Sequence, residues 1–94
     1  RPQSFIPELA SELELSDDVR RRARNLVKQA QETAVANGCQ PTGVAAACVY
    51  IAAREQGRYL TQAAIADAAG TTPVTLRARR DELKIAIGEN SEPE

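Results

Sequence analysis

A ten-residue segment in the middle of this chain, VAAACVYIAA at positions 44–53, constrains the fold more than any other feature, because all of it is apolar apart from the amphipathic Tyr50. Its alanine-rich composition favours a helix, and a helix that is apolar all round is buried on every side. The segment is far shorter than the roughly 20 residues that span a bilayer. We therefore expect the central helix of a soluble bundle, surrounded by the rest of a single domain.

Helix start and stop signals divide the 94 residues into five predicted helices with almost no strand pattern. Ser16, Thr61 and Thr72 are suitable N-cap residues, and a glycine follows three of the predicted helices. The predicted helices cover residues 2–13, 17–37, 41–56, 62–69 and 73–87. We expect an all-α domain over residues 1–87, followed by the acidic segment 88–94 (GENSEPE) as a disordered tail.

Three of the outer helices carry an apolar stripe at helical spacing that would pack against the central helix. Pro7 is compatible with the first helix only in its first turn, because proline has no N–H to donate. The predicted stripe residues are Phe5, Ile6, Leu9 and Leu13 in the first helix, Val19, Ala23, Leu26, Val27, Ala30 and Ala34 in the second, and Leu76, Leu83 and Ile87 in the fifth.

The composition excludes the common catalytic and metal chemistries. The chain has no His, which removes the commonest general base and the commonest metal ligand, and two Cys without a His partner do not make a zinc site. We therefore predict no enzyme activity, no cofactor and no metal. Cys48 is predicted to be a small core residue, and a loop position for Cys39 would permit a redox role. A disulfide between them is not expected inside a cell.

The charge and the aromatic content limit the kinds of nucleic-acid binding. The formal net charge is −1, so no global basic field draws the chain onto nucleic acid. Phe5, Tyr50 and Tyr59 are the only aromatic residues, too few for the stacking platforms of single-strand binders. Arginines cluster at 20–24, which we interpret as a solvated helix face, and at 77–80. Binding to a duplex groove is the nucleic-acid function that remains.

Residues 61–83, TQAAIADAAGTTPVTLRARRDEL, carry the strongest functional signal. A short helix, a turn that begins with Gly70 and a second capped helix predict a helix-turn-helix within residues 61–87. Ala66 is small where the two helices would cross, and Gly70 supplies the positive φ of the turn. The residues expected to face inward are Ile65, Ala69 and Leu76.

The start of the second helix of this motif projects the candidate DNA-reading residues. Val74 and Arg77 are three positions apart and share one helix face. There Arg77 would pair with a guanine, and Val74 would either contact a thymine methyl or exclude a bulkier base edge. Phosphate contacts are predicted for residues at the two helix starts and for the adjacent arginines: Thr61, Gln62, Thr72, Thr75, Arg79 and Arg80. The pattern leaves open an architectural helix pair in which Arg77 forms a surface ion pair with Asp81.

Three stretches carry a family resemblance: PQSFIPELASELEL at 2–15, PTGVAAACVYIAA at 41–53, and the segment 61–83 with its TQ, AG and VTLR elements. Together they span nearly the whole chain, and they resemble the second cyclin-like repeat of archaeal transcription factor B, the counterpart of eukaryotic transcription factor IIB. The TQ opening and the VTLR recognition helix favour the second repeat over the first.

The resemblance implies a five-helix cyclin-like fold in a general transcription initiation factor that binds the complex of TATA-binding protein (TBP) with promoter double-stranded DNA. It implies that Val74 and Arg77 read the element upstream of the TATA box in the major groove and that Thr75 contacts the DNA backbone. The chain departs from the family at Arg80, where a Tyr is usual, and at Thr71, where a β-branched apolar residue is usual. We expect Arg80 to extend its charge outward.

Further expectations about partners and location follow from the resemblance. The zinc ribbon, the linker and the first repeat of this family are absent from these residues, so contact with RNA polymerase is expected only through those regions. We expect a monomeric domain without membrane association, located in the archaeal cytoplasm at the nucleoid, or in the nucleus if the source is eukaryotic. TBP-contacting residues and the preferred bases stay unassigned. The alternative function is a cyclin-like protein-interaction module that does not read bases.

Overall fold

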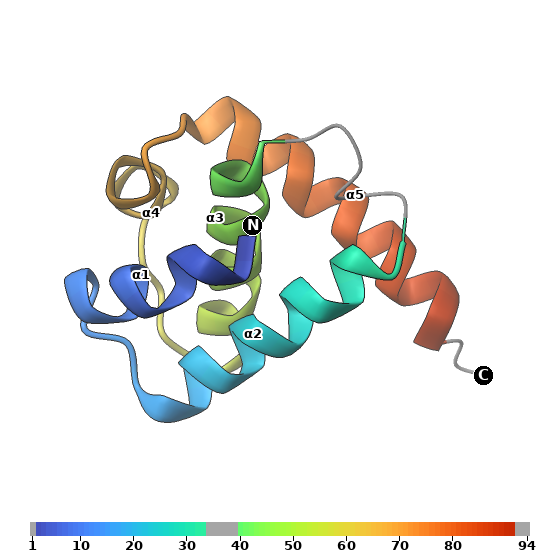
Figure 1. Cartoon of the computed structure of the whole chain (residues 1–94), viewed down its shortest axis with the longest axis horizontal. Helices are drawn as coiled ribbons and strands as arrows, with labels where there is room; N and C mark the ends of the chain where they lie inside the picture. The colour runs from blue at the N-terminus through green and yellow to red at the C-terminus, as the bar shows by residue number, and fades with distance from the viewer. Residues whose placement is uncertain (1, 34–39, 92–94) are drawn as a thin grey trace.

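The computed structural model describes residues 2–33 and 40–91, the last three of these by their backbone alone. Over these residues the chain forms an all-α bundle of five α-helices and a short 3-10 helix (Figure 1). This confirms the expected fold class. The elements are the 3-10 helix η1 (Pro2–Phe5) and the α-helices α1 (Ile6–Glu12), α2 (Asp17–Gln31), α3 (Pro41–Glu55), α4 (Gln62–Ala69) and α5 (Pro73–Ser91).

Helix α3 lies at the centre of the bundle, as its uniformly apolar sequence predicts. Every residue from Gly43 to Ala53 is buried, and the helix contacts η1, α2, α4 and α5. Small side chains predominate along it, so the surrounding helices can approach closely while their larger residues fill the space between them. The fully buried larger residues that complete the core include Ile6, Leu9, Leu26, Ile65, Leu76 and Leu83.

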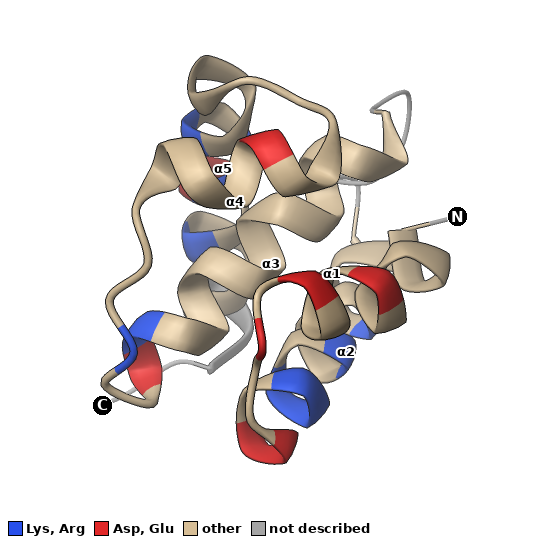
Figure 2. Ribbon diagram, turned by 90° about the vertical axis from the view of Figure 1, so that its left-hand side faces the viewer, with Lys and Arg blue, Asp and Glu red and all other residues tan. Residues whose placement is uncertain are grey.

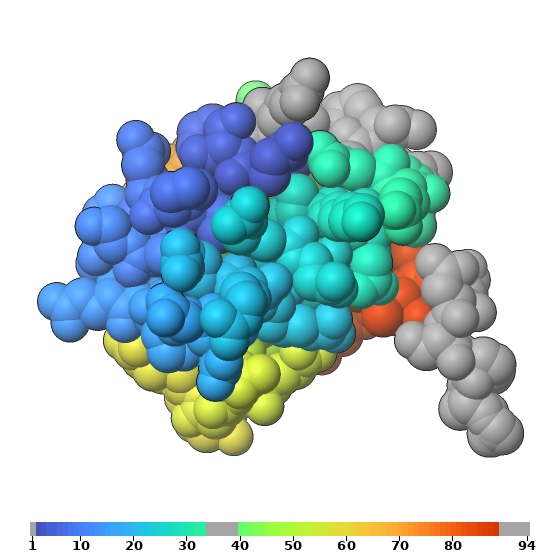
Figure 3. Space-filling view, turned by 60° about the horizontal axis from the view of Figure 1, so that its bottom comes forward, coloured from blue at the N-terminus to red at the C-terminus, as the bar shows by residue number. Residues whose placement is uncertain are grey.

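Helix α2 covers one face of this core beside α1, in cyan and blue in Figure 3. Ser16 caps it, because its hydroxyl oxygen accepts a hydrogen bond from the backbone N–H of Val19 at 3.2 Å. The predicted end at residue 37 is wrong, since α2 ends at Gln31. The hydroxyl of Thr33 donates to the carbonyl of Ala30 at 2.9 Å and so satisfies an acceptor that a further helical turn would have used.

Three of the sequence predictions for this region concern residues that the structure does not describe. They are the stripe position Ala34, the helix stop Gly38 and the loop residue Cys39.

The N-terminal helix also differs in detail from its prediction. Residues 2–5 form a 3-10 turn, and the α-helix begins only at Ile6 with Pro7 in its first turn. Pro7 has no N–H to close a regular helical turn on the residues before it. After α1 the chain reverses through Glu14 at φ 55°, and Arg58 donates hydrogen bonds to the carbonyl oxygens of Leu13 and Glu14 at 3.1 and 3.0 Å.

Helix α5 continues to Ser91, four residues beyond the predicted end at Ile87. The expected disordered tail therefore does not begin at Gly88, and residues 92–94 of that tail lie outside the described part of the chain. Extending an existing helix adds one hydrogen bond for each residue fixed and carries no nucleation cost. A single glycine with roughly 1 kcal/mol lower helix propensity than alanine does not have to end it.

Candidate nucleic-acid interface

Helices α4 and α5 form a helix-turn-helix whose turn is built by local hydrogen bonds. Gly70 adopts φ 77°, which glycine reaches without steric cost. The N–H groups of Gly70 and Thr71 bond back to the carbonyls of Asp67 and Ala66 at 3.1 and 2.9 Å and so close the end of α4. The predicted turn and its glycine are confirmed.

Threonine hydroxyls cap both helices at the positions predicted from the sequence. Thr61 Oγ1 accepts from the N–H of Ala64 at 3.0 Å at the start of α4. Thr72 Oγ1 accepts from the N–H of Thr75 and donates to Thr75 Oγ1, both at 3.2 Å. In the first turn of α5, Pro73 has no N–H and the N–H of Thr75 is already donated to Thr72, so Val74 supplies the remaining N–H that a phosphate oxygen would accept from.

The inward faces of the two helices fix their crossing. The predicted inward residues Ile65, Ala69 and Leu76 are all buried, as is Ala66 at the crossing. Close packing extends to the start of α3, because a Cβ built on Gly43 would lie 2.8 Å from the Cγ2 methyl of Thr75. Thr75 is therefore half-buried, with its methyl directed towards α3.

Val74 and Arg77 are exposed together on the outward side of α5. Val74 is one of the few large apolar side chains left open in the described part of the chain, with 66% of its surface exposed. Arg77 donates from Nη1 to Oε1 of Gln62 at 2.8 Å, which directs its guanidinium towards the start of α4. Asp81, the alternative partner considered for Arg77, instead accepts from Nε of Arg80 at 2.9 Å.

Arg79 and Arg80 do not join Val74 and Arg77 on that outward face. Arg79 and Arg80 lie between the buried residues Leu76 and Leu83 in the sequence, and their side chains are only 22% and 20% exposed. Arg79 pairs with Glu82 at 2.9 Å. Arg80 extends towards α3, where its guanidinium carbon lies 5.7 Å from the ring centroid of Tyr50. Of the eight predicted contact residues, the structure thus brings together Val74, Arg77 and Gln62, and separately Thr72 and Thr75.

Tyr50 and Arg54 are the residues that the sequence analysis missed. Tyr50 is only 8% exposed, and Gln62 donates to its hydroxyl from Nε2 in a long contact of 3.5 Å. This contact and the positive charges of Arg54 and Arg80 lower the pKa of Tyr50. Arg54 lies over the rings of Tyr50 and Tyr59, at 5.3 and 4.8 Å from their centroids. Tyr50 and Arg54 are four positions apart on one helix, and this spacing is the sequence signal that could have identified the pair.

The charges are unevenly distributed over the bundle. Acidic residues gather on α1, on its connection to α2 and at the start of α2, below α4 and α5 in Figure 2, and all are exposed. They are Glu8, Glu12, Glu14, Asp17 and Asp18. Asp17 and Asp18 are paired with Arg20 and Arg21 of α2, at 2.9 and 2.6 Å, so this end of the bundle carries charges of both signs.

No group of three or more potential metal-ligating His, Cys, Asp or Glu side chains occurs within residues 2–33 and 40–88. The helices of the described chain include none with the length and apolar character of a membrane span.

The comparisons with known proteins all indicate the same family. Residues 1–86 match the family described as the transcription factor TFIIB repeat. The chain is 51% identical over 79 residues to transcription initiation factor IIB 5 of Halobacterium salinarum, covering 84% of this chain and 26% of that protein. It is 45% identical over 82 residues to transcription initiation factor IIB of Methanococcus maripaludis, covering 87% of this chain and 24% of that protein. The chain therefore spans about a quarter of the length of these curated relatives.

Proposed function

Because the chain belongs to the transcription factor TFIIB repeat family and its relatives are archaeal transcription initiation factors, we propose that it is the second cyclin-like repeat of such a factor. In this role it binds a TBP–promoter complex at the archaeal nucleoid and reads the element upstream of the TATA box in the major groove. The domain acts by binding, and catalysis is no part of the proposal.

The observation that carries the proposal is the outward pair of Val74 and Arg77 on the first turns of α5. A helix-turn-helix places the N-terminal part of its second helix against base edges. Arg77 is exposed and is held at one end by Gln62, so its guanidinium is presented in a limited range of directions. A bidentate contact of this kind discriminates against a wrong base by roughly 1–3 kcal/mol.

Phosphate contacts from the capped helix starts complete the proposed interface. Thr61 and Thr72 are exposed, and their hydroxyls stand beside the N–H groups of the first turns of α4 and α5. Such groups position a helix-turn-helix on the duplex without reading sequence. Thr75 can contribute only through its hydroxyl, since its methyl packs against α3 and its backbone N–H is already donated to Thr72 Oγ1.

The net charge of −1 makes the isolated domain a weak DNA binder. Specific binding therefore depends on TBP, which holds the domain near the promoter and raises its effective concentration there.

The test is a titration of the domain into TBP bound to promoter DNA, with the wild type and Arg77→Ala. One DNA carries a purine-rich element upstream of the TATA box, and the other carries the same bases scrambled. We expect the wild type to prefer the intact element by roughly tenfold or more, and Arg77→Ala to lose that preference. Arg24→Ala is the charge-matched control, because Arg24 is an exposed residue of α2.

A protein-interaction module is the second candidate function, and the near-neutral charge of the chain is the observation that favours it. It predicts equal binding of the wild-type domain to both TBP–DNA complexes. That result would contradict base reading by Val74 and Arg77 and would direct attention to the surface that meets TBP.

A further inference from the structure

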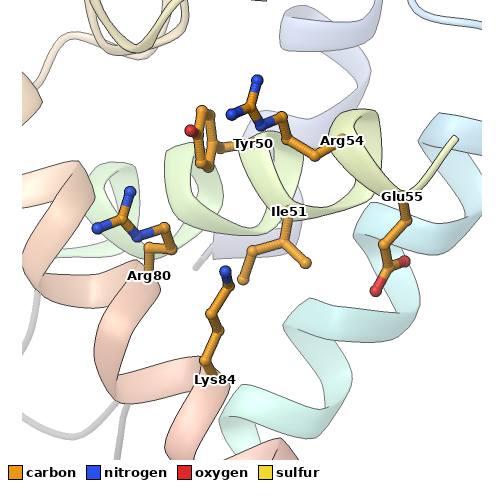
Figure 4. A pocket seen from close by; sticks show the side chains of 6 residues that line it. All are labelled: Tyr50, Ile51, Arg54, Glu55, Arg80 and Lys84. Carbon is orange, nitrogen blue, oxygen red and sulfur yellow. The ribbon is translucent and has the colours of Figure 1, made fainter. Parts of the chain in front are cut away.

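A pocket of about 590 Å³ opens between the second half of α3 and the middle of α5. Helix α3 lines it with the apolar side chain of Ile51 and the ring of Tyr50, and charged side chains surround these two residues (Figure 4). The lining residues are Tyr50, Ile51, Arg54, Glu55, Arg80 and Lys84. None of the residues assigned to base reading lines this pocket.

The charge around the pocket is predominantly positive. Arg54, Arg80 and Lys84 supply three positive charges to its lining, and Glu55 supplies a single negative charge. Both oxygens of Glu55 are already engaged by Arg22 of α2, at 2.7 Å from Nε and 3.2 Å from Nη2. Arg80 gives its Nε to Asp81 and also bonds to Tyr50, and a guanidinium has five N–H donors in all. The pocket is therefore suited to an anion.

The two arginines are held in place by aromatic rings. The guanidinium carbons of Arg54 and Arg80 lie 5.3 and 5.7 Å from the ring centroid of the same residue, Tyr50. Arg54 also lies 4.8 Å from the ring centroid of Tyr59. Stacking of this kind reduces the side-chain freedom that an arginine loses when it binds a ligand, so the cations are preorganised around the opening.

The pocket continues the helix-turn-helix surface along α5. Arg77, Arg80 and Lys84 follow one another at i, i+3 and i+7, so their backbone positions lie along neighbouring parts of α5, although the guanidinium of Arg80 turns from the outward face towards α3. Lys84 lies about 10 Å along the axis from Arg77. Gln62 links the two regions, because it accepts from Arg77 and donates to the hydroxyl of Tyr50. The basic pocket thus begins beside the base-reading face.

We propose that this pocket binds a backbone phosphate of the DNA strand that flanks the bases read by Val74 and Arg77, with Arg54, Arg80 and Lys84 as the cationic ligands. The inference rests on the proposed function and adds Arg54 and Lys84 to its contacts. Arginine N–H groups match the oxygens of a phosphate. An acidic peptide would meet the same charges, but the continuity with Arg77 favours DNA.

The test is the salt dependence of binding to the TBP–promoter complex. Each phosphate contact contributes about −0.9 to the slope of log K against log salt concentration. We expect Arg54→Gln and Lys84→Gln each to make the slope shallower by up to about 0.9 and to weaken binding equally on the intact and scrambled elements. Arg80→Tyr, which restores the residue usual in the family, is expected to act in the same direction. Lys28→Gln, at an exposed position of α2, is the charge-matched control.

The outcomes separate this inference from the proposed function. An unchanged slope in all three variants, with element preference still lost in Arg77→Ala, would overturn the phosphate site and leave base reading intact. Weaker binding to TBP without DNA in Arg54→Gln would assign the pocket to a protein partner and would also overturn it. A wild-type domain that ignores the DNA altogether would contradict both. Circular dichroism melts equal to the wild type show that a variant has kept its fold.

Discussion

Arg77 of α5 and Gln62 of α4 are fifteen residues apart in sequence and are joined by a hydrogen bond of 2.8 Å from Nη1 to Oε1. The bond crosses the helix-turn-helix from the second turn of its recognition helix to the first residue of the preceding helix. It restricts an exposed arginine that would otherwise sample many rotamers, so the same glutamine that is a candidate phosphate contact also positions a candidate base contact.

Replacing Gln62 by alanine is expected to reduce base discrimination without unfolding the domain. One hydrogen bond contributes about 1 kcal/mol net, so the preference for the intact element should fall roughly fivefold. Titration of the variant into both TBP–promoter complexes measures this ratio. Gln56→Ala removes the same side chain from an exposed position after α3 and should leave the ratio unchanged. An unaltered preference in Gln62→Ala would show that Arg77 needs no positioning by α4.

Gly43→Ala is expected to destabilise the domain by about 1–3 kcal/mol, because the added Cβ would lie 2.8 Å from Cγ2 of Thr75 and overpack the contact between α3 and α5. Thr75→Ser removes that methyl while keeping the hydroxyl, so it should rescue Gly43→Ala in a double-mutant cycle. Thermal unfolding of the four proteins measures the coupling.

Gly88→Ala is the matched control, since nothing lies within 4 Å of the corresponding Cβ in the exposed part of α5. It should stabilise the helix by about 0.5–1 kcal/mol through propensity alone. A stabilising effect of Gly43→Ala as large as that of Gly88→Ala would contradict the close packing of α3 on α5.

Glu14→Gly is expected to stabilise the domain by about 0.5 kcal/mol. Glu14 has φ 55°, a conformation that costs an L-residue with a side chain roughly 1–2 kcal/mol, and the gain is offset in part by the greater entropy of glycine in the unfolded chain. Arg58 holds this turn through the carbonyl of Glu14, a contact that the substitution retains. Glu12→Gly, at the last residue of α1, should instead destabilise. Chemical denaturation that ranks the two variants the other way would refute strain at Glu14.

The sequence was most informative where structure depends on neighbours within one helical turn. Thr61, Thr72 and Gly70 act through bonds to residues three or four positions away, so their roles could be predicted from the sequence. The burial of residues 43–53 of α3 could also be predicted, because this segment is almost entirely apolar on every side.

Contacts that depend on how helices cross were not predictable in the same way. Arg80 extends to Tyr50, thirty residues earlier, only because α5 crosses α3 at that point. Arg77 likewise meets Gln62 in place of the nearer Asp81, since the turn at Gly70 brings the start of α4 alongside it. The candidate base readers could therefore be predicted, while the residues that hold them could not.

The Cys48 thiol is expected to be inert in the folded domain. Burial raises its pKa to about 12, and the positive charge of Arg22 offsets this only in part. In a Cys39→Ser variant, a thiol reagent at pH 8 should label Cys48 only after denaturation. The raised pKa keeps the proton on the folded form, so its stability contribution is present below about pH 8.5 and is lost as the pH rises towards 12. Native-state labelling at the rate of a free thiol would contradict the burial of α3.

Tyr50 is expected to ionise below the ordinary tyrosine pKa of about 10, because Gln62 donates to its oxygen and Arg54 and Arg80 stabilise the phenolate. The chain has two Tyr and no Trp, so the ultraviolet absorbance of tyrosinate in a Tyr59→Phe variant reports Tyr50 alone. Adding Gln62→Ala should move the titration upward.

The lowered pKa of Tyr50 also fixes the sign of its effect on stability. Between its folded and unfolded pKa values the unfolded chain binds more protons, so the free energy of unfolding rises with pH across that interval and is unaffected below it. Denaturation of the wild type and Tyr50→Phe from neutral to alkaline pH measures this as a difference, which cancels the titration of groups common to both. The free energy of unfolding of the wild type should rise relative to that of Tyr50→Phe as the pH approaches 10. A constant difference would mean that the cations around the pocket do not reach the phenolate, and would weaken the case that they converge on an anion there.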